Sequence, residues 1–401
     1  MEFQLMILIS TIITIIEYFI TKRFFNPTTI LSWPFIIVIF INKIFGNKYG
    51  FYDINEKTIN KITIGILFFF VGSISSTIIK KYIGIKNNRK TSLIIKYNID
   101  NIYIYVMGVA VINLMRLVLV LHKYGVKNFI VNDGMNGLLM TGIFSHMLLS
   151  SYPLVAILIS HALKKKEYKF LFPVILIFIV IYFTFVKYHM ISLVLIIIIY
   201  LNIENPKMFS KTVPVLIVTP IIIFFANYLT NFNARGITAE NDYILKHLIN
   251  YISGGLIYDS ISPNFSYNNY GLLEIIVMIL MVIPNLFINL LWGRKVYPYE
   301  TMQFYSMGWN GENGNVINTI SFLFSSKNII GTILLIIFLG IIVGSLYSKD
   351  QSKYLLMAAV YTFVFLSFYA TFLVLVPPWE MIIFSLIMPK LFLKNRRKLI
   401  V

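Results

Sequence analysis

The sequence predicts an all-α fold, a polytopic bundle of about 11 transmembrane helices (10–12), from three observations. Of its 401 residues, 58% are hydrophobic and only 12% are charged, whereas about a quarter are charged in a soluble domain. Apolar runs of about 20 residues, long enough to cross a bilayer, recur along the whole chain. Basic residues gather between some of these runs, as they do in cytoplasmic loops.

The apolar runs predict eleven spans in one integral membrane domain that comprises residues 1–401. One further apolar segment, 272–292, carries Pro284 and Asn285 in its middle. We expect a broken element there, because irregular backbone at membrane depth must pack on protein or line a cavity. The expected spans are 3–20, 28–45, 61–79, 101–121, 141–163, 169–185, 189–203, 212–230, 328–347, 354–374 and 379–393.

The basic loops predict the orientation of the spans. Lysines and arginines lie between spans three and four, between five and six, between seven and eight, and in the tail 394–398. All of them face the cytoplasm if Met1 faces out and 272–292 does not cross. In that case residues 231–327 form one extracytoplasmic loop region with amphipathic or re-entrant helices.

Two features of the composition narrow the possible partners and the possible kinds of active site. The net charge of +18 fits basic loops beside anionic lipid, so we expect the lipid bilayer as a partner and no nucleic acid. The chain has no cysteine, which excludes a thiolate nucleophile and a cysteine-ligated zinc.

The densest polar stretch outside the spans is Asn231–Tyr270. Its pattern predicts an amphipathic helix on the outer membrane surface, capped by Thr238, with Glu240 in the first turn. We expect Gly254-Gly255 to end this helix in left-handed geometry. The alternative is an ordinary interfacial helix without a site.

Cations at the outer ends of spans suggest an anionic ligand, because arginine inside a span is costly and outer loops usually avoid basic residues. A phosphate or diphosphate, held bidentately by arginine, fits this set. Taken singly, each of these residues could instead snorkel or form a salt bridge. The candidates are Arg116, Lys187, His189, Arg235 and Arg294.

The same stretch offers groups for proton transfer, because a positioned carboxylate or histidine can take the proton of an attacking hydroxyl. The candidates are Glu240, His247 and Asp259, with Asp242 and Glu312 as further carboxylates. Glu240 and Asp242 diverge on a helix, so we expect no metal site.

Three stretches resemble the Wzy-type oligosaccharide repeat-unit polymerases of O-antigen and capsule synthesis. They are Arg235-Gly236 followed by YISGGLIYD at 251–259, FVKYH at 185–189, and NTISFLF at 318–324 followed by Gly331 and Gly340–Gly344. Many family members carry Asp-Phe-Gly before the glycine that corresponds to Gly331. Here that place reads Ser326-Lys327-Asn328, which leaves the role of that aspartate without a counterpart.

The resemblance implies a GT-C-like membrane glycosyltransferase at the outer face of the bacterial cytoplasmic membrane, independent of metal and cofactor. Donor and acceptor would be undecaprenyl-diphosphate-linked oligosaccharides, and the product an O-antigen of lipopolysaccharide, a capsule or an exopolysaccharide. A chain-length regulator and a flippase would be its partners.

Under this hypothesis Arg235 holds the diphosphate, assisted by Arg116, Lys187 or Arg294. Tyr251, with Gly254 and Gly255, shapes the acceptor site together with Asp259, and His247 or a carboxylate acts as the base. Two other hypotheses about the function stay open. A lipid-linked oligosaccharide flippase would usually show two similar halves, and an O-antigen ligase would differ in its acceptor.

Overall fold

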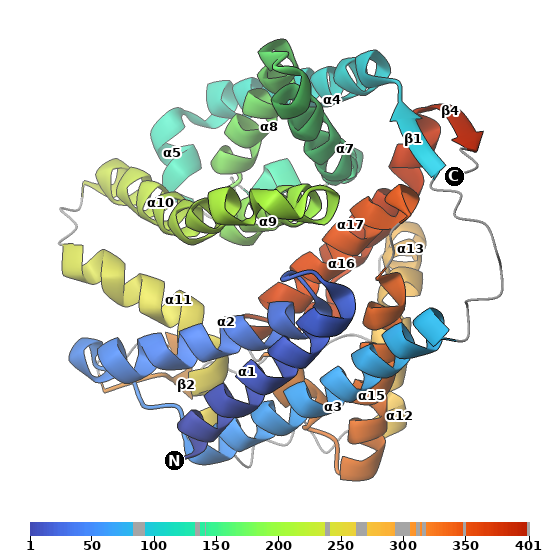
Figure 1. The fold of residues 1–401 in the computed structure, drawn as a ribbon. Helices are drawn as coiled ribbons and strands as arrows, with labels where there is room; N and C mark the ends of the chain where they lie inside the picture. The colour runs from blue at the N-terminus through green and yellow to red at the C-terminus, as the bar shows by residue number, and fades with distance from the viewer. Residues whose placement is uncertain are drawn as a thin grey trace. The chain divides into compact units, whose positions relative to one another are not determined.

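The chain folds almost entirely into helices in the computed structural model (Figure 1). The structure describes residues 1–82, 93–132, 137–140, 142–236, 241–261, 271–292, 305–309, 313–314, 318–347 and 350–398. Within these ranges, seven helices are long and apolar enough to cross a membrane. They are α1 (Glu2–Thr21), α2 (Pro27–Ile41, extended by tighter and wider turns to Tyr49), α3 (Glu56–Tyr82), α4 (Ile99–Tyr124), α7 (Ile143–Lys165), α9 (Lys187–Glu204) and α15 (Ile329–Leu346).

These helices coincide with seven of the expected spans, so the prediction of an all-α protein with membrane-spanning helices is confirmed at that level. The expected span 169–185 is a shorter apolar helix, Tyr168–Phe183, which includes α8 (Phe172–Phe183). The expected span 212–230 lies inside α10 (Phe209–Arg235), and 379–393 overlaps α17 (Val376–Leu391), which has 16 residues.

The expected span 354–374 is wrong as a continuous helix. The segment is divided into α16 (Tyr354–Phe365), a 3₁₀ turn at Leu366–Phe368 and another at Phe372–Val374. The backbone freed from the helix finds other partners, because the Ala370 carbonyl accepts the Thr319 hydroxyl at 2.9 Å. Apolar composition alone does not reveal such a break, since every residue of the segment remains buried or half-buried.

The segment 272–292 is broken, as expected. It forms α12 (Leu272–Leu280) and α13 (Val282–Trp292), with Met281 between them. Pro284 lies three residues beyond the break, and its ring lacks the N–H that the Leu280 carbonyl would need in a continuous helix.

The chain forms two compact units. Unit 1 comprises residues 1–88, 245–347 and 363–379, and unit 2 comprises residues 89–244, 348–362 and 380–401. Each unit is therefore built from segments far apart in the sequence, and α11 (Asn241–Ile261), α16 and α17 each contribute residues to both.

In unit 1, glycines allow α3 and α15 to pack backbone against backbone. A Cβ on Gly340 would lie 2.3 Å from the Phe69 carbonyl oxygen, and one on Gly344 would lie 2.6 Å from the Ser73 carbonyl oxygen. Such small-residue interfaces let membrane helices approach closely. The contacts advance along both helices together, so α3 and α15 run parallel and enter unit 1 from the same end.

The segment that precedes α3 also meets two segments distant in the sequence. Phe51 forms a β-bridge with Gly308, and Asn55 Nδ2 donates to the Ser260 carbonyl at 2.7 Å. Residues 50–55, 259–260 and 307–309 therefore lie at one end of unit 1.

In unit 2, the basic tail pairs with the segment that precedes α4. Strand β4 (Leu393–Lys398) runs antiparallel to β1 (Leu93–Tyr97), as Figure 1 shows. The pairing places residues 393–398 beside residues 93–97, which precede α4. Burial, together with the carboxylates of Glu204 and Asp350, raises the pKa of Tyr97 in this strand to about 12.

Candidate functional site

The predicted site residues are divided between the two units. Unit 2 carries Arg116, Lys187, His189 and Arg235, and unit 1 carries His247, Tyr251, Gly254, Gly255 and Asp259. Glu240 and Arg294 lie outside the described residues, as does the predicted cap Thr238.

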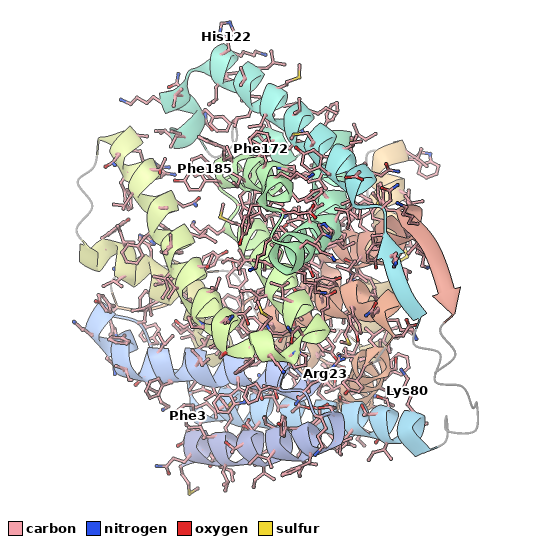
Figure 2. The ribbon with its side chains drawn as sticks, turned by 45° about the horizontal axis from the view of Figure 1, so that its top comes forward. Phe3, Arg23, Lys80, His122, Phe172 and Phe185 are labelled. Carbon is pink, nitrogen blue, oxygen red and sulfur yellow. The ribbon has the colours of Figure 1, made fainter. Side chains whose placement is uncertain are left out.

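One small apolar cluster of unit 2 is made of Leu117, Phe129, Ile130 and Leu139, with Phe185 and Ala234 packed against it. Arg116, Lys187 and Arg235 each lie within two residues, along the sequence, of one of these side chains. Helices α4, α8 and α10 end near this cluster, while α7 and α9 begin near it. We call this region the cation end of unit 2. Figure 2 labels Phe185, whose ring packs 6.4 Å from that of Phe129 in α5 (Val126–Val131).

Arg116 is anchored by backbone carbonyls and by an aromatic ring. Its Nη2 donates to the Leu138 carbonyl at 3.1 Å, and its guanidinium lies 5.0 Å from the centre of the Phe144 ring. Stacking on a ring and donation to carbonyls hold a guanidinium in one orientation. Leu139, whose carbonyl also faces Nη1 at 3.5 Å, belongs to the apolar cluster.

Lys187 is the first residue of α9, not part of the preceding turn as predicted. The turn from α8 consists of residues 184–186, where Phe185 takes a positive φ of 54°. A bulky residue in this region is an outlier. The Lys187 ammonium lies 4.6 Å from the Tyr228 ring centre and 5.4 Å from that of Phe224, both on α10.

His189, predicted to lie in an external turn, is 3% exposed within the first turns of α9. Its ring stacks on Tyr188 with centroids 4.1 Å apart, and its Nδ1 has no hydrogen-bond partner among the described residues. At this burial His189 cannot meet a ligand in solvent, so contact with a substrate would require one that enters the bundle.

Arg235 is the last residue of α10, and Gly236 ends that helix with φ 71°. The helix therefore continues five residues past the expected span end at 230, and the left-handed position at its end favours glycine. The Arg235 side chain is exposed, and its Nη2 donates to the Val131 carbonyl at 3.2 Å. A guanidinium has five N–H donors, so this bond leaves donors for an anion.

In unit 1, Asp259 is buried and bonded to the start of α3. Its Oδ2 accepts the Thr58 hydroxyl at 2.7 Å, and its Oδ1 lies 2.8 Å from Lys61 Nζ. Asp259 is 6% exposed and Lys61 is 27% exposed. The carboxylate thereby ties α11 to α3, a contact that the sequence did not reveal because the partners are 198 residues apart.

The prediction that Gly254-Gly255 ends the helix is wrong, since α11 continues to Ile261. The reason is packing. A Cβ on Gly255 would lie 3.0 Å from the Tyr369 carbonyl oxygen, and the Gly255 carbonyl accepts Asn318 Nδ2 at 3.3 Å. The glycine thus serves close approach within unit 1. Residues 253–260 are buried, so this half of the helix is core and not a membrane-surface helix.

Tyr251 stands on the same helix and packs on Tyr369, with ring centroids 4.6 Å apart. His247, one turn earlier, is half-buried. Neither Tyr369 nor Met307, which lies 3.5 Å from a Cβ on Gly254, was predicted. Both come from segments distant in the chain, and no local signal in the sequence marks them.

The described residues contain no group of three or more histidine or acidic side chains that could hold a metal ion. No family model, curated protein or solved structure matches the chain.

Proposed function

We propose that the chain is a membrane glycosyltransferase. It would polymerise undecaprenyl-diphosphate-linked oligosaccharide repeat units at the extracytoplasmic face of the bacterial cytoplasmic membrane. The observation that supports this proposal is the cation end of unit 2. There Arg116, Lys187 and Arg235, from three different helices, each lie within two residues, along the sequence, of a side chain of one apolar cluster.

The chemistry of a lipid diphosphate matches this arrangement. Its diphosphate needs charged donors, and guanidinium groups bind phosphate oxygens bidentately. Its prenyl chain needs an apolar surface at the same depth. In glycosyl transfer the diphosphate leaves with additional negative charge, so cations that hold it also stabilise the transition state.

The acceptor hydroxyl must lose a proton as it attacks the anomeric carbon of the donor. His247 on α11 is our candidate for the base, with Tyr251 in the acceptor site one turn further along. Asp259 is a weaker candidate than predicted, because Thr58 and Lys61 already bond to both of its oxygens.

The other end of unit 2 supports the orientation. Lys164 Nζ lies 2.6 Å from Glu204 Oε1 there, next to Lys165 and Lys166 and the β1–β4 pair. Because basic loops stay in the cytoplasm, the cation end would face the opposite side. That side is where lipid-linked repeat units are joined in the family that the sequence resembles.

The test is extension of a lipid-linked repeat unit by purified protein in lipid nanodiscs, read as a ladder on a gel. We expect the ladder to disappear in Arg235→Lys and Arg116→Lys, because lysine cannot copy the planar fork. Lys207→Gln, exposed between α9 and α10, is the matched control and should leave the ladder unchanged.

Two results would contradict the proposal. Wild-type protein that moves the lipid-linked unit across the bilayer but never lengthens it would indicate a flippase. Transfer of the glycan only to a lipid A core sugar would indicate a ligase. A ladder that chelator abolishes would overturn the expectation of metal independence.

A further inference from the structure

Glu17 is a fully buried carboxyl group inside α1, a membrane-spanning helix. Its Oε2 accepts the backbone N–H of Thr28 at 2.9 Å, and its Oε1 accepts the Ser73 hydroxyl at 2.7 Å. It forms no ion pair with any described residue. An ionised carboxylate buried without a counter-charge is expensive, particularly at membrane depth.

Four hydroxyl groups lie on the same buried faces of α1 and α2. Ser10 and Thr14 precede Glu17 by about two turns and one turn of α1, and Thr28 and Ser32 are one turn apart on α2. All four side chains are at most 6% exposed. The oxygens of Ser10, Thr14 and Ser32 have no hydrogen-bond partner among the described residues, and the Thr28 hydroxyl bonds to the Glu17 carboxyl group.

The absence of partners is unusual, because a hydroxyl on a helix can always donate to the carbonyl one turn earlier. Thr11 does so to Ile7 at 2.8 Å, and Thr21 does so to Glu17 at 2.8 Å, both on the same helix α1. Thr14 lies between them and does not. Buried polar groups left without a partner call for an explanation such as a water or an ion.

The helix register places two of these oxygens, those of Thr14 and Ser32, one turn from the Glu17–Thr28 contact. The hairpin between α1 and α2 is short, and the Glu17–Thr28 bond fixes where the two helices pair. One turn back along α1 from Glu17 is Thr14, and one turn forward along α2 from Thr28 is Ser32. The two helices run in opposite directions, so Thr14 and Ser32 are placed at the same level. Figure 1 shows α1, α2 and α3 side by side in blue.

We propose that unit 1 binds a monovalent alkali cation between α1, α2 and α3, coordinated by the Glu17 carboxylate and the hydroxyl oxygens of Thr14, Thr28 and Ser32. Hard cations prefer such oxygen ligands. One carboxylate balances one positive charge, whereas a divalent ion would leave a net charge buried in the membrane. A proton on Glu17 could donate a hydrogen bond to only one of the hydroxyl oxygens. This inference does not depend on the proposed glycosyltransferase activity.

Basic groups near the site do not occupy it. Arg23, just beyond α1, stacks over the ring of Tyr347 at 5.4 Å, and Lys22 lies 5.2 Å from the Phe19 ring centre. Neither is bonded to Glu17. The described basic side chains thus form no ion pair with Glu17.

The test is thermal unfolding of the full chain in detergent, with choline chloride replaced by NaCl or KCl at constant ionic strength. A cation that binds only the folded state raises the unfolding midpoint as its concentration increases. We expect this rise in wild-type protein, and we expect Glu17→Gln to raise the half-saturating concentration at least about tenfold.

Two further variants keep the test decisive if Glu17→Gln does not fold. The double variant Thr14→Val with Ser32→Ala should weaken the cation dependence, whereas Thr11→Val, whose hydroxyl bonds to its own helix, should leave it unchanged. A wild-type midpoint that depends on pH but not on Na⁺ or K⁺ would mean a protonated carboxyl and would overturn the proposal. So would a cation dependence that Glu17→Gln leaves intact.

Discussion

Removing the Asp259 carboxylate should destabilise unit 1 through its contact with α3. The carboxylate accepts two bonds, from the Thr58 hydroxyl at 2.7 Å and from Lys61 Nζ at 2.8 Å. In Asp259→Ala both donors lose their acceptor. Thr58 is buried, so its hydroxyl has no water to replace the bond, whereas Lys61 is 27% exposed and can turn toward solvent.

The expected loss of unfolding free energy follows from the exposed fractions of Thr58 and Lys61. Breaking a fully buried pair by removing one partner costs about 3–5 kcal/mol. Because Lys61 can regain hydration, we expect about 2–3 kcal/mol for Asp259→Ala, mainly from the charge-assisted bond to Thr58. Asp259→Asn keeps an acceptor for that hydroxyl and should lose about 1–2 kcal/mol.

A double-mutant cycle tests the contact. Unfolding free energies in detergent are compared for wild type, Asp259→Leu, Lys61→Met and the double variant. Since the double variant leaves no unpaired charge, it should be more stable than Asp259→Leu alone, with a coupling energy of about 1–3 kcal/mol. A coupling energy near zero would refute the reasoning, because the two side chains would then act independently.

The same variants separate a structural from a catalytic role of Asp259. If the carboxylate only holds α11 against α3, glycan extension returns in the double variant together with stability. If it acts as the base, the double variant is stable and inactive. The stability result therefore has to be read beside the extension assay on the same preparations.

Three further predictions concern the helices, each read as unfolding free energy in detergent. Gly340→Leu should destabilise by about 3 kcal/mol or more, since even a Cβ there lies 2.3 Å from the Phe69 carbonyl oxygen. The control is Gly108→Ala, which should be neutral or stabilising by up to about 1 kcal/mol because no atom lies within 4 Å of the added Cβ. Equal losses of stability in the Gly340 and Gly108 variants would contradict the close packing of α3 on α15. Gly236→Ala should destabilise by about 1–2 kcal/mol, because φ is 71° there, and an unchanged value would mean that this helix end relaxes. Asn318→Ala should lose about 1–2 kcal/mol, because it caps α14 (Thr319–Leu323), whereas Asn318→Asp should retain most of the cap.

The sequence predicted the helices well where the signal is local. Hydropathy depends only on neighbouring residues, so seven spans could be predicted directly from the sequence. The break in 272–292 was also local, because Pro284 lacks the N–H that a continuous helix needs.

The prediction failed where a distant segment decides the outcome. Gly254-Gly255 is a good helix terminator by local rules, but α11 continues through it. Gly255 instead allows the backbone near Tyr369 to approach closely. The break after Phe365 has the same origin, since the freed Ala370 carbonyl is satisfied by Thr319.

The sequence by itself thus determined the class of the protein, a membrane bundle of α-helices, because composition and the length of apolar runs fix which solvent the chain can tolerate. Only the tertiary structure decided which polar groups meet. The pairing of Asp259 with Lys61 and the burial of Glu17 among hydroxyls depend on how helices pack, and no short-range pattern encodes this. Buried polar groups must find partners, and those partners usually come from elsewhere in the chain.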